Sequence, residues 1–280
     1  LAGLSALGAL AALGGCGAAH RATLRSPHKP VEFERSMTLY DHPLDVHLAR
    51  PAQLQPGTPL LFYATGDGGW RGKDVETYRR LIRWGYPVAG FSAPNYLSHL
   101  GFVSGTTTPG RLARDYQRMI EFAKRTLDLP AATRTVLVGV SRGAGLAVVA
   151  AGRAELNVEL AGVLAVALTK EEEYVRHYRV RPGRTPADMP TRELVEFQTY
   201  DYLDRLRELP LVVIQSTGDN YLPAPSARKL FGPDAELRRL VSIESRDHGF
   251  SDARDALYAE MAGALRWMAK RTPPAAAPVK

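Results

Sequence analysis

Two hydrophobic patterns alternate along most of the 280-residue chain. Short runs that are apolar at nearly every position indicate strands buried on both faces. Longer segments, in which apolar residues recur every three or four positions, indicate helices with one buried face. We predict an N-terminal antiparallel pair at 36–42 and 44–51, then buried strands at 58–66, 86–94, 134–140, 160–168, 209–216 and 237–245. Helices are predicted at 73–85, 108–128, 144–154 and 251–271. The alternation predicts an α/β fold with a mostly parallel central sheet and helices on both faces.

Capping residues mark several helix ends. Thr108 is a predicted N-cap and Pro109 suits the first helical position, where the missing N–H costs nothing. Gly85 fits a C-cap, and Ser251 is the predicted N-cap of the last helix.

One polar segment, at about 169–208, interrupts the alternation between two predicted core strands. It is rich in tyrosine and arginine and includes Tyr174, Arg176, His177, Tyr178, Arg179, Arg181 and Arg184. Because it is too long for a plain connection, we predict a small helical cap over the functional site.

Residues 1–16 have the character of an export signal. They are apolar and small, and too few to span a bilayer as a mature helix. The segment Leu13–Cys16 resembles a lipobox, in which the cysteine is lipidated and becomes the new N-terminus. The alternative is a simple cleaved signal that removes Cys16. We expect a tether at 17–30, a folded domain at 31–271, a disordered tail at 272–280, and a mature protein outside the cytoplasm.

A candidate nucleophile lies between the predicted strand at 134–140 and the helix that follows it. Gly139-Val140-Ser141-Arg142-Gly143 fits the pattern G-x-S-x-G. In a strand-to-helix turn, this pattern holds a serine hydroxyl exposed above the carboxyl edge of the sheet. The alternative is an ordinary turn, and the strand and helix on either side favour the nucleophile.

A serine needs a base to remove its proton, and the base needs a carboxylate to orient it. His248 follows the last predicted strand, and Asp219 follows the strand at 209–216. Ser141, Asp219 and His248 therefore have the chain order of the α/β-hydrolases, so we predict this fold, with a catalytic triad at the carboxyl ends of the strands. Asp247 is a rival acid, but its adjacency to His248 makes the orienting hydrogen bond awkward. Asp219 also has the alternative of a simple turn residue.

The loop Gly66-Asp67-Gly68-Gly69-Trp70 supplies candidates for the oxyanion hole. One donor should be the N–H of Arg142, directly after the nucleophile, and the second that of Asp67, with Gly68 as the alternative. Gly66, Gly68 and Trp70 are predicted to contact substrate. The other interpretation is a tight turn in which Trp70 plugs the core, and both can hold together. No metal or cofactor is expected, because the Asp and His residues lack ligand spacing.

The chain has a net charge of +7 and a pI near 9.6. This charge favours anionic surroundings such as a phospholipid surface or nucleic acid, unless it only reflects an arginine-rich genome. The arginines are scattered and no nucleic-acid motif is present, so no nucleic-acid partner is expected.

The residues 62–74, FYATGDGGWRGKD, together with VLVGVSRGAG at 136–145, resemble the VirJ/AcvB-type family of bacterial envelope proteins. The resemblance implies an α/β-hydrolase domain in the periplasm. It further implies hydrolysis of aminoacylated phosphatidylglycerol, or an association with type IV secretion. Two positions depart from the family pattern: Arg142 stands where many members have an aromatic residue, and Gly145 where an acidic residue is common.

These features together predict an extracytoplasmic serine esterase acting on aminoacyl esters of phosphatidylglycerol at a membrane surface. A non-catalytic accessory protein that binds secretion-system proteins is one alternative. A general carboxylesterase is the other.

Overall fold

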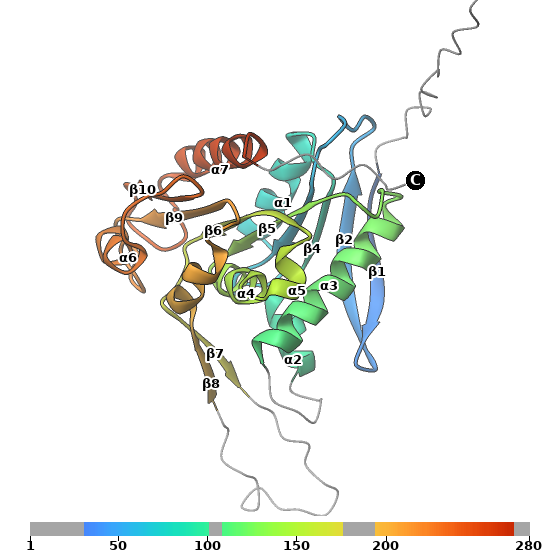
Figure 1. Ribbon diagram of the computed structural model, residues 1–280, viewed down its shortest axis with the longest axis horizontal. Coiled ribbons are helices and arrows are strands. Elements are labelled where there is room, and N and C mark those ends of the chain that lie inside the picture. Colours follow the sequence, from blue (N-terminus) through green and yellow to red (C-terminus); the bar gives the residue numbers. More distant parts are fainter. Residues whose placement is uncertain (1–30, 101–107, 176–193, 272–280) are drawn as a thin grey trace, which may run out of the picture.

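An eight-stranded sheet forms the centre of the protein (Figure 1). The computed structural model describes residues 31–100, 108–175 and 194–271. The strands are β1 (Val31–Leu39), β2 (His42–Arg50), β3 (Leu60–Ala64), β4 (Val88–Phe91), β5 (Thr135–Val140), β6 (Leu160–Val166), β9 (Leu211–Ser216) and β10 (Arg238–Ile243). Their order is β1-β2-β4-β3-β5-β6-β9-β10. Strand β2 pairs antiparallel with both of its neighbours, and the other pairs are parallel. The predicted mostly parallel sheet is confirmed.

Helices cover both faces of this sheet. Helices α1 (Lys73–Arg83) and α7 (Arg254–Ala269) pack on one face. The other face carries α2 (Ala93–Leu100), α3 (Pro109–Thr126), α4 (Arg142–Ala151), α5 (Ala154–Asn157) and α6 (Ala224–Phe231). Strand β3 shows why its run is apolar throughout, since Leu60 and Phe62 pack under α3 and α4 while Leu61 packs under α1. The sequence prediction missed α2 and α6, which have eight residues each and are too short to show a clear period.

Two of the predicted helix caps are confirmed, and one is wrong. The Thr108 hydroxyl accepts a hydrogen bond from the Arg111 N–H at 3.2 Å. Gly85 follows α1 with φ of 89°, a left-handed conformation that glycine adopts at little cost. Ser251 does not cap the last helix, which begins at Arg254, because its N–H and hydroxyl both donate to Asp247. The turn that these bonds close brings His248 to the edge of the sheet.

In the described parts of the insertion after β6, where we predicted a helical cap, the structure has a strand pair and one 3-10 helix. β7 (Glu171–Val175) and β8 (Leu194–Gln198) pair antiparallel and project from the lower part of the view in Figure 1. Glu172 lies opposite Phe197, and both side chains are buried against the body of the protein. The residues before them, Glu171 and Glu196, are exposed, as expected when successive side chains of a strand point to opposite faces. A 3-10 helix, η2 (Thr199–Leu206), follows β8.

Several predicted features lie outside the described residues. They are the signal segment with Cys16, the tether at 17–30, the arginines at 176, 179, 181 and 184, and the tail at 272–280. Among the helices in the described ranges, none combines the length and the apolar composition needed to cross a bilayer.

Candidate active site

A strained serine marks the turn between β5 and α4. Ser141 has φ of 52° and ψ of −118°, a conformation that an L-residue adopts only when its surroundings enforce it. Its N–H donates to the Val166 carbonyl at 2.8 Å, and its carbonyl accepts from Ala144 at 2.8 Å. These bonds hold the backbone in a sharp turn, so the hydroxyl stands above the carboxyl ends of the strands.

The two glycines that flank the serine permit this turn. A Cβ on Gly139 would lie 2.2 Å from the Gly143 carbonyl oxygen. A Cβ on Gly143 would lie 2.2 Å from the carbonyl oxygen of Ala64, at the end of β3. The start of α4 therefore rests directly on backbone, which explains the glycines of the G-x-S-x-G pattern.

The structure brings Ser141, His248 and Asp219 together. The His248 Nε2 lies 2.8 Å from the Ser141 Oγ, and its Nδ1 lies 2.7 Å from the Asp219 Oδ2. Both distances are within the range for proton transfer through a hydrogen bond. The three residues follow β5, β10 and β9, so their convergence depends on the order of the parallel strands.

Asp219 is held by a set of donors that the sequence did not reveal in full. Its side chain is fully buried. Its Oδ1 accepts from the N–H groups of Tyr221 at 2.8 Å and Leu222 at 3.2 Å. Its Oδ2 accepts from the Gln215 amide at 3.0 Å as well as facing His248. Sequence analysis missed Gln215, although a polar residue inside the apolar run of β9 was a usable signal.

The rival acid, Asp247, has other partners. Its carboxylate accepts from the N–H and the hydroxyl of Ser251. It therefore stabilises the turn beside His248, and Asp219 is the carboxylate that orients the imidazole.

The glycine-rich loop after β3 lies against the nucleophile. A Cβ on Gly66 would be 3.5 Å from the Ser141 Cβ. The Gly66 N–H donates to Asp74 at 3.1 Å, and Asp74 also accepts from the Tyr63 hydroxyl at 2.6 Å. No group in the described ranges accepts from the N–H of Asp67 or of Gly68. Both N–H groups therefore stay candidates for the second oxyanion donor.

Sequence analysis missed Asp74 as well as Gln215; Asp74 holds the start of the glycine-rich loop through the Gly66 N–H. Burial raises the pKa of its carboxyl group, while the bonds from Tyr63 and Gly66 act in the opposite direction. Its signal in the sequence, an acidic residue in the first turn of a helix, is too common to be diagnostic.

Trp70, predicted to contact substrate, packs elsewhere. Its ring stacks on His47 with centroids 3.7 Å apart and meets Tyr78 edge-on at 4.9 Å. It also covers Gly90, where a Cβ would be 2.9 Å from the indole. Trp70 thus plugs the space between α1, β2 and β4, so the alternative interpretation of this residue fits the structure.

Comparison with known proteins agrees with this geometry. A family model described as "Bacterial virulence protein (VirJ)" matches residues 59–176, which include the glycine-rich loop and Ser141. Residues 59–176 are therefore similar to VirJ proteins, and we call them the VirJ segment. Asp219 and His248 lie beyond that VirJ segment, although the structure joins them to its serine. No curated protein matches the sequence.

Solved structures extend the comparison to the rest of the fold. Est1E from Butyrivibrio proteoclasticus is 12% identical with a TM-score of 0.57, and the match covers 85% of this chain and 98% of Est1E. The esterase domain of a Rhodothermus marinus protein is 21% identical with a TM-score of 0.54, covering 86% and 98% of the two chains. Dienelactone hydrolase from Anabaena variabilis is 18% identical with a TM-score of 0.54, covering 88% and 100%. The VirJ segment is thus part of an α/β-hydrolase fold.

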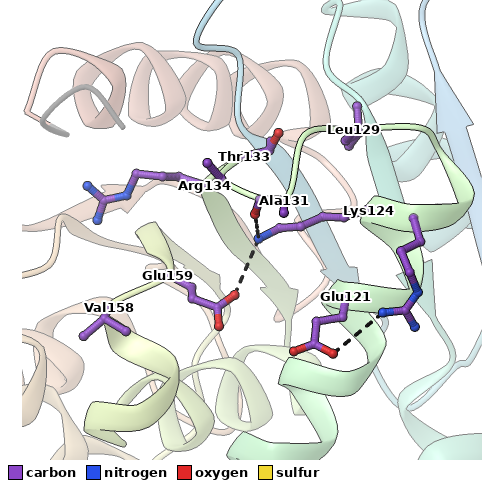
Figure 2. A pocket seen from close by; sticks show the side chains of 10 residues that line it. Glu121, Lys124, Leu129, Ala131, Thr133, Arg134, Val158 and Glu159 are labelled. Atoms are coloured by element: carbon purple, nitrogen blue, oxygen red, sulfur yellow. Dashed lines mark hydrogen bonds and ion pairs between the residues drawn. The ribbon is translucent and has the colours of Figure 1, made fainter. Parts of the chain in front are cut away.

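A hollow of about 800 Å³ lies at the amino ends of the strands, across the sheet from the triad (Figure 2). It is bordered by the end of α3 and by the residues that precede β5 and β6. The buried Lys124 ammonium donates to the Ala131 carbonyl at 3.2 Å and pairs with Glu159 at 3.5 Å (Figure 2). Since Ser141 follows the carboxyl end of β5, this hollow at the amino ends is remote from the triad.

Replacing Asp219 with asparagine is expected to lower kcat by about 10⁴-fold. An amide keeps the size of the side chain but does not stabilise the imidazolium and favours the wrong tautomer of His248. Turnover of a chromogenic ester, measured from pH 5 to 9, tests this. Asp247→Asn is the comparison variant: its amide oxygen can still accept from the Ser251 N–H and so keep the turn beside His248, and kcat should fall by no more than about tenfold. Equal losses in the two variants would contradict the assignment of the acid.

Proposed function

We propose that this protein is an extracytoplasmic serine esterase that hydrolyses aminoacyl esters of phosphatidylglycerol. One observation carries the esterase part of the proposal: the Ser141 hydroxyl lies 2.8 Å from an imidazole whose other nitrogen faces a buried carboxylate. An α/β-hydrolase fold with this arrangement is the architecture of a serine hydrolase.

The arrangement supports a two-step reaction through an acyl-enzyme. His248 removes the proton of Ser141 as the oxygen attacks the ester carbonyl. The N–H groups of Arg142 and Asp67 stabilise the negative oxygen of the tetrahedral intermediate. His248, now an imidazolium held by Asp219, donates its proton to the departing glycerol oxygen. It next activates a water molecule, which releases the amino acid and restores the serine.

Sequence similarity and charge support the proposed substrate class. The VirJ segment spans residues 59–176, and the resemblance described above implies an aminoacylated phospholipid. The net charge of +7 would draw the protein to an anionic bilayer, with about 1 kcal/mol for each basic residue close to the surface. A lipid anchor on Cys16 would hold the site beside that surface, and a secretion-system partner is compatible with the same location.

Vesicles of phosphatidylglycerol that contain lysyl-phosphatidylglycerol test the proposal. The full chain is expected to release free lysine, measured by mass spectrometry, and Ser141→Ala is expected to release none. A parallel assay with p-nitrophenyl acetate separates the alternatives. Hydrolysis of the acetate without release of lysine would overturn the lipid substrate and favour a general carboxylesterase. A wild type inert to both esters and to a fluorophosphonate would favour the accessory-protein alternative.

A further inference from the structure

The Arg142 side chain connects three segments that surround the nucleophile. Its Nε and Nη2 both contact the Asp67 carboxylate, the latter at 3.2 Å, so the pair is bidentate. Its Nη1 lies 3.5 Å from the Glu172 carboxylate. Asp67 lies on the glycine-rich loop, Arg142 directly follows the nucleophile, and Glu172 lies on β7. The guanidinium is thus held from two sides.

The glycine-rich loop needs such a contact at its tip. Main-chain groups fix its two ends, because the Gly66 N–H binds Asp74 and the Gly69 N–H binds the Gly66 carbonyl at 3.1 Å. The peptides between them contain the N–H groups of Asp67 and Gly68, for which no acceptor exists in the described ranges. The hydrogen bonds from the Arg142 guanidinium to the Asp67 carboxylate therefore tie this tip to the nucleophile turn.

Glu172 helps to fix the position of the Arg142 side chain. The side chain of Glu172 is 4% exposed, and its other oxygen accepts from the Thr169 hydroxyl at 2.7 Å. It lies over Gly145, one turn into α4, where a Cβ would be 2.1 Å from the Glu172 Cγ. Its ion pair with Arg142 holds the Nη1 end of the guanidinium, and breaking an ion pair of a buried carboxylate is costly. The other two nitrogens of the guanidinium, Nε and Nη2, bind the Asp67 carboxylate.

We propose that the Asp67–Arg142 ion pair positions the oxyanion hole, by setting the distance between the two peptides that donate to it. The inference rests on the proposed esterase function. Its physical reason is that the two donors belong to different loops, and a donor shifted by a fraction of an ångström loses much of its bond to the oxyanion. The ion pair joins the side chains of the two residues whose N–H groups serve as donors in the proposed mechanism. Asp67 and Arg142 therefore act here as positioning residues, apart from their N–H groups.

Asp67→Ala is the direct test, because it removes the carboxylate and keeps the backbone N–H. We expect kcat for p-nitrophenyl acetate to fall about tenfold, since small misplacements of catalytic groups have effects of this order. KM should stay within about twofold, because the ground-state ester gains little from the oxyanion donors.

A double-mutant cycle distinguishes positioning from a general structural role. Arg142→Lys keeps a cation beside Glu172 but loses the bidentate geometry, and we expect a similar loss in kcat. The combined Asp67→Ala and Arg142→Lys variant should lose little more than either single variant. Glu76→Ala is the matched control and should keep full activity. It removes an exposed carboxylate on α1 that, among the ion pairs of the described residues, pairs only with Arg80, at 3.9 Å.

The outcomes separate this inference from the proposed function. A wild type that neither hydrolyses the ester nor reacts with a fluorophosphonate contradicts the esterase function, and the inference falls with it. A reactive wild type whose Asp67→Ala variant keeps its full kcat, or whose double variant shows additive losses, contradicts the positioning role alone.

Discussion

Ser141→Ala is expected to abolish ester hydrolysis, with a loss in kcat of about a million-fold. The hydroxyl is the atom that attacks, and the described part of the site offers no second nucleophile within hydrogen-bonding distance of His248. The serine hydroxyl adds little to the binding of the ground-state ester, so KM should change little. The alanine takes over the same strained turn, which should leave the fold intact.

Two measurements check this prediction. Turnover of p-nitrophenyl acetate reports on catalysis, and covalent labelling by a fluorophosphonate, detected by mass spectrometry, reports on the nucleophile itself. Ser98→Ala is the matched control, because Ser98 is an exposed serine on α2 that binds only the Asn95 carbonyl among the described contacts. Labelling that persists in Ser141→Ala would show that another residue is the nucleophile.

Gly143→Ala is expected to have the largest effect on stability, with a loss of about 3 kcal/mol or more in the free energy of unfolding. The new Cβ would lie 2.2 Å from the Ala64 carbonyl oxygen and 2.7 Å from that of Thr65. These are backbone atoms at the end of a central strand, so they cannot move aside as a flexible side chain would. Either α4 shifts away from β3 or the strand itself is distorted.

Urea denaturation followed by circular dichroism measures this loss. The matched control is Gly263→Ala in the middle of α7, where the nearest atom to a new Cβ is 4.0 Å away. That substitution should stabilise the protein by about 0.5 to 1 kcal/mol, since alanine favours the helix over glycine. A Gly143→Ala protein as stable as the wild type would contradict the close packing of α4 on β3.

The two departures from the family pattern become one feature in the structure. Gly145 leaves the space that the Glu172 side chain occupies, and Glu172 in turn holds the guanidinium of Arg142. In the sequence they were two unrelated departures from the family pattern on one helix. Their connection passes through β7, a strand that the hydrophobic pattern did not predict.

The hydrophobic pattern alone was sufficient for the main elements of the fold. Strands buried on both faces are apolar throughout, and helices with one buried face show their own period, so both can be found from local sequence. The chain order Ser141, Asp219 and His248, each after a predicted strand, was enough to predict that the three converge. Parallel strands place their carboxyl ends at one edge of the sheet, and the structure has the predicted convergence there.

Tertiary structure decided the partners of individual side chains. It packed the partly buried Trp70 on His47 at the margin of the core. It also paired Gln215 with Asp219, Asp74 with Gly66, and Arg142 with Asp67. Periodicity reports which face of an element is buried, but it carries no information about which loops meet over that face. The contacts between loops depend on the order of the strands in the sheet and on close backbone packing at glycines. Both exist only once the whole chain has folded.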